Sequence, residues 1–178
     1  MIEIRWHGRG GQGAFTAAKI LGAAAVMDSK FSLAFPSFGP ERRGAPISAF
    51  NKIDSKPIIN RSVIRTCDYM IFLDDSLFDV SYLDDLKKDG MVLINTPLNE
   101  KYSDFPQITA IDANKIAIEI INRPICNTAM LGALAHFSDD VSFSSIQSSI
   151  DLYLSKTNPA KNHLIFEKAY DYFKEVQK

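Results

Sequence analysis

The sequence has few cysteines and no grouped metal ligands. Its two cysteines, Cys67 and Cys126, lie far apart and form no Cys-x-x-Cys pair, so neither a zinc site nor an iron–sulfur site is predicted. No Ser/His/Asp or Cys/His arrangement of the kind used for nucleophilic catalysis is evident either. We interpret the two thiols as buried side chains, which fits a reducing cytoplasm.

Strong charge and long apolar runs are also missing. The formal net charge is −1 over 178 residues, which predicts no binding to nucleic acid. No apolar run approaches the roughly 20 residues of a membrane span, and the chain opens on an expected strand rather than a signal peptide. With 46% hydrophobic residues, residues 1–178 are predicted to form one packed cytoplasmic domain.

What the sequence does contain is a glycine-rich turn near its start. Gly8, Gly10, Gly11 and Gly13 lie between an alternating stretch at residues 2–6 and an alanine-rich stretch at residues 14–28. The alternation predicts a strand and the alanines predict a helix. Backbone N–H groups at such a helix start favour an anion.

The spacing Gly8-x-Gly10-x-x-Gly13 also matches the dinucleotide-binding fingerprint. That fingerprint requires an acidic residue at the end of the second strand, to hold a ribose. Here Asp28 precedes the second apolar run, residues 31–38, and Glu41 lies beyond it. Three interpretations stay open: a tight turn without a ligand, an anion or partner contact, and an NAD site.

A second unusual stretch is a loop at residues 36–46. It holds three prolines and two glycines, which exclude a helix or a central strand. Its centre is Glu41, Arg42 and Arg43. The planar arginine side chains suit a phosphate or a carboxylate, and a solvated loop tip with a local ion pair is the alternative.

The remaining elements alternate between strands and helices, which predicts an α/β protein. Strands are expected at residues 31–35, 69–73, 91–94 and 107–111, with a hairpin or an irregular extended pair of 47–51 and 53–59 around the turn 54–56. Helices are expected at 83–88, 115–121, 129–137, 142–154 and 159–176. The predicted fold is a three-layer α/β/α, Rossmann-like fold with a mostly parallel sheet and one antiparallel element.

Several polar residues follow these elements, and each has a structural and a functional interpretation. Asp74 and Asp75 follow a buried strand. Capping of the next segment by one of them is favoured over metal binding or acid/base chemistry, because adjacent side chains on a strand point apart. His7 opens the glycine turn, and a packing or hydrogen-bonding role is favoured over a catalytic one. Asn127 or Thr128 is expected to cap the next helix, whose Gly132 suits a closely packed face.

Two long motifs carry a family resemblance. They are residues 5–14 (RWHGRGGQGA) and residues 34–46 (AFPSFGPERRGAP), with supporting matches at 49–53, 57–58, 73–74, 95–96 and 127–134. Together they resemble the gamma subunit of 2-oxoacid:ferredoxin oxidoreductases, the pyruvate and 2-ketoisovalerate synthase group. The resemblance spans nearly the whole chain, in the same order.

The resemblance implies a role within a multi-subunit enzyme. Such enzymes convert a 2-oxoacid, coenzyme A and oxidised ferredoxin to acyl-CoA, CO2 and reduced ferredoxin. Thiamine diphosphate, Mg²⁺ and [4Fe-4S] clusters are expected in the alpha, beta and delta subunits, and no cofactor is expected in this chain. Pyruvate is the expected substrate, with branched-chain 2-oxoacids as the alternative.

On this resemblance, the turn and the loop together form the predicted site. Its residues are Gly8, Gly10, Gly11, Gln12, Gly13, Glu41, Arg42 and Arg43, and they are expected to contact coenzyme A or another subunit. No catalytic and no metal-binding residue is predicted in this chain. The rival hypothesis is a stand-alone dinucleotide-binding oxidoreductase domain, and a third is a plain anion-binding or scaffold module that belongs to no enzyme.

Overall fold

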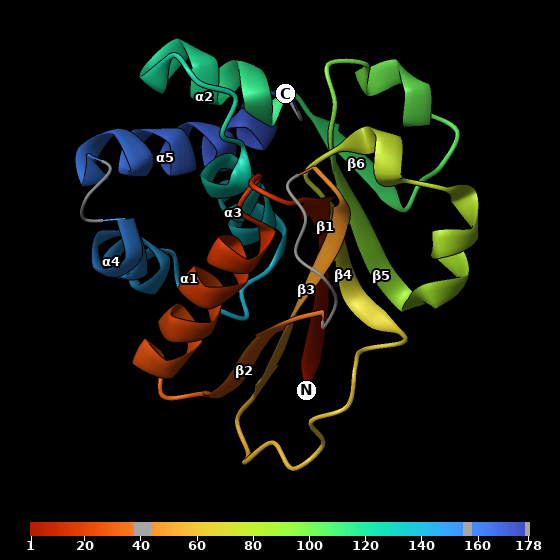
Figure 1. The fold of residues 1–178 in the computed structure, drawn as a ribbon, viewed down its shortest axis with the longest axis vertical. Coiled ribbons are helices and arrows are strands. Elements are labelled where there is room, and N and C mark those ends of the chain that lie inside the picture. The colour runs from red at the N-terminus through yellow and green to blue at the C-terminus, as the bar shows by residue number, and fades with distance from the viewer. Residues whose placement is uncertain (38–43, 155–157, 177–178) are drawn as a thin grey trace.

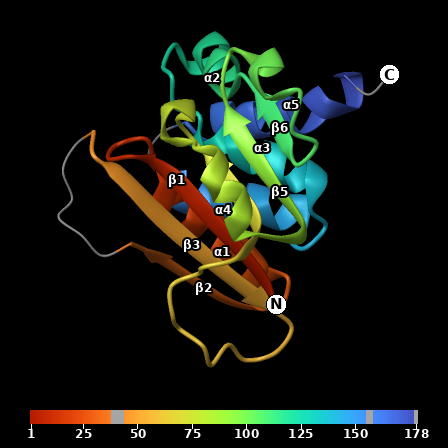
Figure 2. The same cartoon turned by 90° about the vertical axis from the view of Figure 1, so that its right-hand side faces the viewer.

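A computed structural model describes residues 1–37, 44–154 and 158–176. In this part of the chain six strands form a sheet in the order β2-β3-β1-β4-β5-β6 (Figures 1 and 2). The strands are β1 (Ile2–Arg9), β2 (Phe31–Pro36), β3 (Pro46–Asp54), β4 (Cys67–Phe72), β5 (Leu86–Asn95) and β6 (Ile108–Ile111). The sheet confirms the predicted α/β fold class.

One strand runs against all the others. β1, β4, β5 and β6 pair in parallel, whereas β3 is antiparallel to both β1 and β2. The β1–β3 register extends from Ile2 opposite Ile53 to Arg9 opposite Pro46. The predicted antiparallel element is therefore β3, which lies between the first two strands of the sequence.

The predicted hairpin around residues 54–56 is wrong. β3 is one strand that ends at Asp54, and its hairpin partner is β2. After β3 the Asp54 carboxylate accepts a hydrogen bond from the Lys56 backbone N–H at 3.1 Å, and Pro57 has no N–H to give to a ladder. Ile59, expected to end a strand, is 91% exposed, so burial does not favour pairing there.

The α-helices cover one face of the sheet, as Figure 1 shows. They are α1 (Ala14–Met27), α2 (Ala113–Ile121), α3 (Asn127–Phe137), α4 (Phe143–Leu154) and α5 (Pro159–Val176). The larger core lies between these helices and the sheet. Its members include the predicted alanine and leucine face of α1 and the aromatic residues Phe166 and Phe173 of α5.

The other face carries a thinner layer with a smaller core. Three short 3₁₀ helices cover it: η1 (Asp75–Leu77), η2 (Val80–Asp85) and η3 (Asn99–Tyr102). A helix predicted at residues 83–88 is wrong, because β5 already begins at Leu86. Leu86 pairs with Cys67 of β4, and this long-range pairing outweighs a local preference for helix.

A buried polar chain ties the first strand, the third strand and the first helix together. The Trp6 indole N–H donates to the Asn51 side-chain oxygen at 2.9 Å. The Asn51 amide in turn donates to the Ala18 carbonyl at 2.8 Å. Both side chains are fully buried, so their hydrogen bonds fix the position of α1 on the sheet.

None of the helices in the described residues is both long and apolar enough to cross a membrane.

Candidate functional site

The carboxyl ends of the parallel strands gather several polar segments at one edge of the sheet. We call this edge the carboxyl rim; it comprises residues 8–13 at and after the end of β1, residues 44–45 before β3, residues 74–76 after β4 and residues 95–96 at and after the end of β5. Folds of this type bind their ligands at this edge. The rim is therefore the place to test the predicted site.

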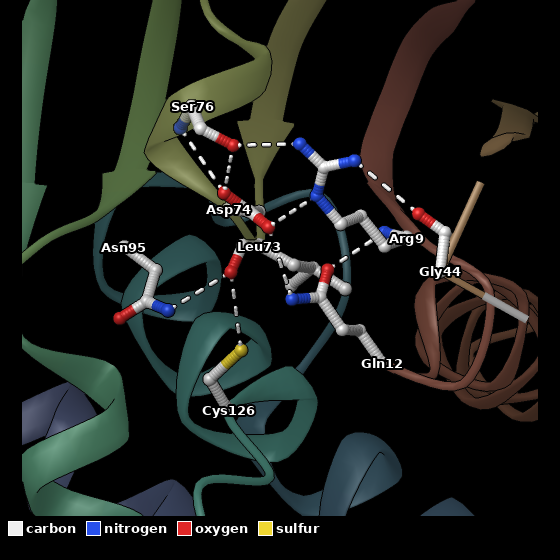
Figure 3. A network of polar contacts seen from close by, with 8 residues as sticks. All are labelled: Arg9, Gln12, Gly44, Leu73, Asp74, Ser76, Asn95 and Cys126. Carbon is white, nitrogen blue, oxygen red and sulfur yellow. Dashed lines mark hydrogen bonds and ion pairs between the residues drawn. The ribbon is translucent and has the colours of Figure 1, made fainter. Parts of the chain in front are cut away.

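Arg9 links three of these segments, as Figure 3 shows. Its Nε donates to Asp74 Oδ2 at 2.8 Å, one terminal nitrogen donates to the Ser76 hydroxyl at 2.9 Å, and the other donates to the Gly44 carbonyl at 3.2 Å. Every nitrogen of the guanidinium thus has a partner within the chain. Arg9 acts as a clamp that holds the rim together.

Asp74 is the centre of this network and also caps η1. Its Oδ1 accepts from the Ser76 backbone N–H at 3.1 Å, which confirms the predicted capping role. Gln12 adds a contact to Asp74 Oδ2 at 3.4 Å. Burial by itself raises the pKa of Asp74, but the hydrogen bonds from Ser76 and Arg9 outweigh it and hold the pKa below its ordinary value.

Leu73, the residue after β4, is joined to the last residue of β5 beneath this network. The Asn95 amide donates to the Leu73 carbonyl at 2.9 Å, and the Cys126 thiol contacts the same carbonyl at 3.6 Å (Figure 3). Asn95 Oδ1 accepts from the Asn114 backbone N–H at 3.2 Å. Burial raises the pKa of the Cys126 thiol to about 12, so this cysteine is an unreactive packing group.

The glycine turn is shorter than predicted, because β1 continues through Gly8 and ends at Arg9. Gln12 closes the turn: its backbone N–H donates to the Arg9 carbonyl at 2.9 Å, and its side-chain oxygen accepts from the Arg9 N–H at 2.7 Å. Gly13, with φ 85°, precedes α1. A side chain at Gly13 would meet Asn127, since a Cβ there would lie 2.6 Å from Asn127 Nδ2.

Asn127 therefore has a different role from the predicted one. α3 already begins at Asn127, its N-cap is Cys126, and that cap makes no side-chain hydrogen bond. Asn127 and Thr128 are both buried, and Asn127 packs against the glycine turn across the rim. Asn127 thus contacts Gly13, just before α1, instead of capping its own helix.

The end of the Pro/Arg loop lies against the glycine turn. The Gly10 N–H donates to the Ala45 carbonyl at 2.9 Å, and the Gly44 N–H donates to the Gly10 carbonyl at 3.1 Å. The turn and the loop end therefore meet at one edge of the sheet, as the sequence predicted. Glu41, Arg42 and Arg43 lie outside the described residues, so their roles stay predictions.

His7 is a packing residue. Its ring stacks on Phe72 at a centroid distance of 4.5 Å and meets Tyr82 edge-on at 4.9 Å. Burial first, and then the nearby charge of Arg5, lowers the pKa of His7 to about 3. The imidazole is therefore neutral at physiological pH and sits between aromatic rings.

The sequence interpretation named the glycines and Gln12 but missed Arg9. The sequence did hold an indication of this role, because Arg9 is a long cationic side chain between two glycines and such a side chain commonly pairs with a carboxylate. Asp74, which follows the buried strand predicted at residues 69–73, was a candidate partner. In the described part of the chain, no three His, Cys, Asp or Glu residues lie close enough together to hold a metal ion. The two cysteines are separately buried and free, so they do not suit an iron–sulfur cluster.

Comparison with known proteins gives the family. Residues 3–172 match the family described as pyruvate ferredoxin/flavodoxin oxidoreductase. The chain belongs to this family. It is 52% identical over 147 residues to pyruvate synthase subunit PorC of Methanothermobacter marburgensis, with 82% of each chain covered. It is 46% identical over 178 residues to the pyruvate/ketoisovalerate oxidoreductases common subunit gamma of Pyrococcus furiosus, with 96% of each covered.

Solved structures in the pyruvate ferredoxin/flavodoxin oxidoreductase family have the same fold. The crystal structure of pyruvate oxidoreductase subunit PORC from Thermotoga maritima matches with a TM-score of 0.82 and 34% identity, covering 96% of this chain and 95% of that one. The structural similarity therefore extends over nearly the whole length of both chains.

The geometry of this family member disfavours the dinucleotide hypothesis. β3 separates β2 from β1, so β2 does not place an acidic residue beside the glycine turn. Asp28 lies at the far end of α1, about 21 Å from the turn for a 14-residue helix. Its carboxylate is engaged by Ser142, whose backbone N–H donates at 2.6 Å.

Proposed function

We propose that this chain is the gamma subunit of a multi-subunit 2-oxoacid:ferredoxin oxidoreductase, with pyruvate as its 2-oxoacid. The enzyme would convert pyruvate, coenzyme A and oxidised ferredoxin to acetyl-CoA, CO2 and reduced ferredoxin. The observation that carries this proposal is similarity over nearly the full length to proteins named as PorC or gamma subunits. The proposed partners are alpha, beta and delta subunits, with ferredoxin as electron acceptor.

Within that complex the chain would serve assembly and coenzyme A access rather than bond-breaking chemistry. Thiamine diphosphate, Mg²⁺ and [4Fe-4S] clusters would be held by the other subunits. This division is supported by the two separate, buried thiols and by the neutral, ring-packed His7. Residues 1–178 would act as one domain, in a reducing cytoplasm that keeps both thiols free.

The carboxyl rim is the proposed surface toward the other subunits. The backbone bonds between Gly10 and residues 44–45 support this, because they bring one end of the Pro/Arg loop to the glycine turn. All three guanidinium nitrogens of Arg9 donate to groups of the same chain. Arg9 is therefore proposed to hold the rim in shape, and other residues are proposed to bind the anion. Glu41, Arg42 and Arg43 are proposed to contact coenzyme A or a neighbouring subunit.

Co-purification tests the proposal directly. A tagged chain, co-expressed with the other chains of its operon or genome neighbourhood, is expected to retain larger partners in fixed stoichiometry. The assembled enzyme should reduce a ferredoxin or a viologen dye only when pyruvate and coenzyme A are both present. A chain that purifies alone, or that binds NAD stoichiometrically, would contradict the proposal.

A double substitution tests the coenzyme A contact. Arg42→Ala with Arg43→Ala should raise the KM for coenzyme A about tenfold, the equivalent of one charge-assisted hydrogen bond, or weaken assembly. The KM for pyruvate should change little. Lys115→Ala with Arg123→Ala, two exposed cations on and just after α2, is the matched control. Unchanged kinetics together with intact assembly would refute the contact.

A further inference from the structure

Unpaired positive charge gathers at the edge of the sheet opposite the carboxyl rim. The segment between β3 and β4, residues 55–66, contains Lys56, Arg61 and Arg65 and no Asp or Glu. All three side chains are exposed. Among the described residues, none of them lies within ion-pair distance of a carboxylate. We call residues 55–66 the basic loop; it projects beside the N-terminus in Figures 1 and 2.

The acidic residues around the basic loop already have other cationic partners. The ion pairs are Asp54 with the Met1 ammonium at 3.3 Å, Glu3 with Lys52 at 3.6 Å and Lys87 at 3.2 Å, Asp68 with Lys87 at 2.7 Å, and Asp85 with Arg5 at 2.7 Å. The negative charges of these four carboxylates are thus compensated by cations other than those of the basic loop. The three loop cations therefore remain as a local excess of positive charge on a chain whose net charge is −1.

The same loop exposes aliphatic side chains between its cations. Ile59 is 91% exposed and Val63 is 56% exposed. Protein interfaces combine an apolar centre with arginine and a polar rim, whereas non-specific binding to a nucleic acid rests almost entirely on positive charge. Alternating aliphatic and cationic residues therefore favour a protein surface as the partner.

The basic loop is held in place by the body of the protein. Ile64 is buried in the smaller core, the Lys52 ammonium donates to the Asn60 carbonyl at 3.2 Å, and the Arg5 guanidinium donates to the Arg65 carbonyl at 3.4 Å. Asn60 Oδ1 accepts from the Ser62 N–H at 2.9 Å. A preorganised loop loses less conformational entropy on binding than a free one.

A surface cavity beside the basic loop could accommodate a side chain of a partner protein. It has a volume of about 390 Å³ and is lined by Glu3, Asn60, Ser62, Val63, Arg65 and Thr66. The Glu3 carboxylate in its wall is paired with Lys52 and Lys87. The Arg65 guanidinium and the polar side chains of Asn60, Ser62 and Thr66 are therefore the lining groups that could bind a carboxylate of the partner.

We propose that the basic loop docks on an acidic, partly apolar surface of a neighbouring polypeptide in the enzyme complex. This inference rests on the proposed function, because it needs a complex in which the chain is one subunit. Carboxylates of the partner would pair with Lys56, Arg61 and Arg65, and Ile59 would insert between them. The chain would then contact partners at both ends of its sheet.

The test measures binding of the full-length tagged chain to the remaining subunits of the complex at physiological salt. The triple variant Lys56→Glu, Arg61→Glu, Arg65→Glu should raise the apparent Kd about 100-fold, since charge reversal places like charges face to face. Ile59→Ser should raise it about tenfold. Raising the salt concentration should weaken wild-type binding and strengthen binding of the triple variant relative to it.

Two matched controls separate docking from general effects. Lys115→Glu, Arg123→Glu, Lys161→Glu reverses three exposed cations elsewhere on the chain, and Leu164→Ser removes another exposed aliphatic side chain, which is 51% exposed. Both controls should leave the Kd within about threefold of wild type. Thermal unfolding of each variant should match that of wild type, because the substituted side chains are exposed.

The possible outcomes are distinct. If the wild-type chain captures no other subunit, the proposed function fails and docking fails with it. If wild type and the triple variant assemble equally well, docking fails while the proposed function stands. If the loop variants lose binding to phosphatidylserine vesicles or to RNA while assembly is unchanged, the partner is a polyanion and the proposal is wrong.

Discussion

Replacing Gly132 by alanine is expected to lower the free energy of unfolding by about 2–3 kcal/mol, the upper part of the roughly 1–3 kcal/mol typical of overpacked cores. An alanine Cβ at this position would lie 2.2 Å from the Phe166 carbonyl oxygen and 3.1 Å from Ala169 Cβ. Both belong to α5, so the two helices must move apart before the methyl group fits. Relief is difficult because the closest atom is backbone rather than a flexible side chain.

Thermal or urea unfolding of the isolated chain measures this effect. For a chain of this size the midpoint should fall by roughly 5–10 °C. Gly22→Ala is the matched control, since Gly22 also lies inside a helix and its nearest neighbours are side-chain atoms of Ala34 and Ser32 at 3.1 and 3.2 Å. Its gain in helix propensity, about 1 kcal/mol, should offset most of the crowding. Equal destabilisation by the two substitutions would contradict the expected close contact of α3 with α5.

Gly13→Ala should affect both stability and the assembled enzyme. Gly13 has φ 85°, a conformation that disfavours a Cβ by about 1–2 kcal/mol. The new methyl group would also displace the buried Asn127 side chain, which lies 2.6 Å away. We therefore expect a loss of about 2–3 kcal/mol in unfolding free energy. The shifted rim should also lower kcat/KM of the complex about tenfold, because small misplacements at a site reduce rates strongly.

A set of variants separates strain from steric overlap at Gly13. Gly11→Ala adds a methyl group at φ 101° with no heavy atom within 4 Å, so it should show the backbone strain alone, about 1–2 kcal/mol. In a double-mutant cycle, Asn127→Ala should recover about 1 kcal/mol of the Gly13→Ala loss, because it removes the overlapping side chain. The packing of Asn127 against the turn does not contribute to stability if Gly13→Ala and Gly11→Ala lower the unfolding free energy equally and Asn127→Ala recovers none of the Gly13→Ala loss.

Gly132→Ala and Gly13→Ala both test positions where a glycine allows two segments distant in sequence to pack closely. The sequence indicated the two glycines but not the residues that they contact. Gly132 was recognised as lying on a closely packed face of its helix, and the structure confirms this. Its contact is with the Phe166 backbone, 34 positions further along the chain, and a local pattern has no means of naming that partner. Likewise, Gly13 belonged to a recognised motif, whereas its neighbour Asn127 was predicted to be a helix cap.

Local patterns did determine the elements with strong periodicity. The buried strands β4 and β6, the helices α2 and α5, and the capping of η1 by Asp74 follow from side chains within a few residues of one another. The two long motifs, residues 5–14 and 34–46, also indicated the family. Neighbouring residues are sufficient for such features, because capping bonds and one-sided burial depend on short stretches of chain.

Only the tertiary structure decided how those elements combine. The position of β3 between β1 and β2, the extension of β5 back to Leu86, and the clamp of Arg9 on Asp74 all join residues far apart in the sequence. Strand pairs and ion pairs form between segments that are distant in the sequence. Each segment could pair with several others, so a local pattern does not specify its partner. The sequence by itself therefore determined the α/β class and the family of this protein, and the packing of distant segments decided the geometry of its rim.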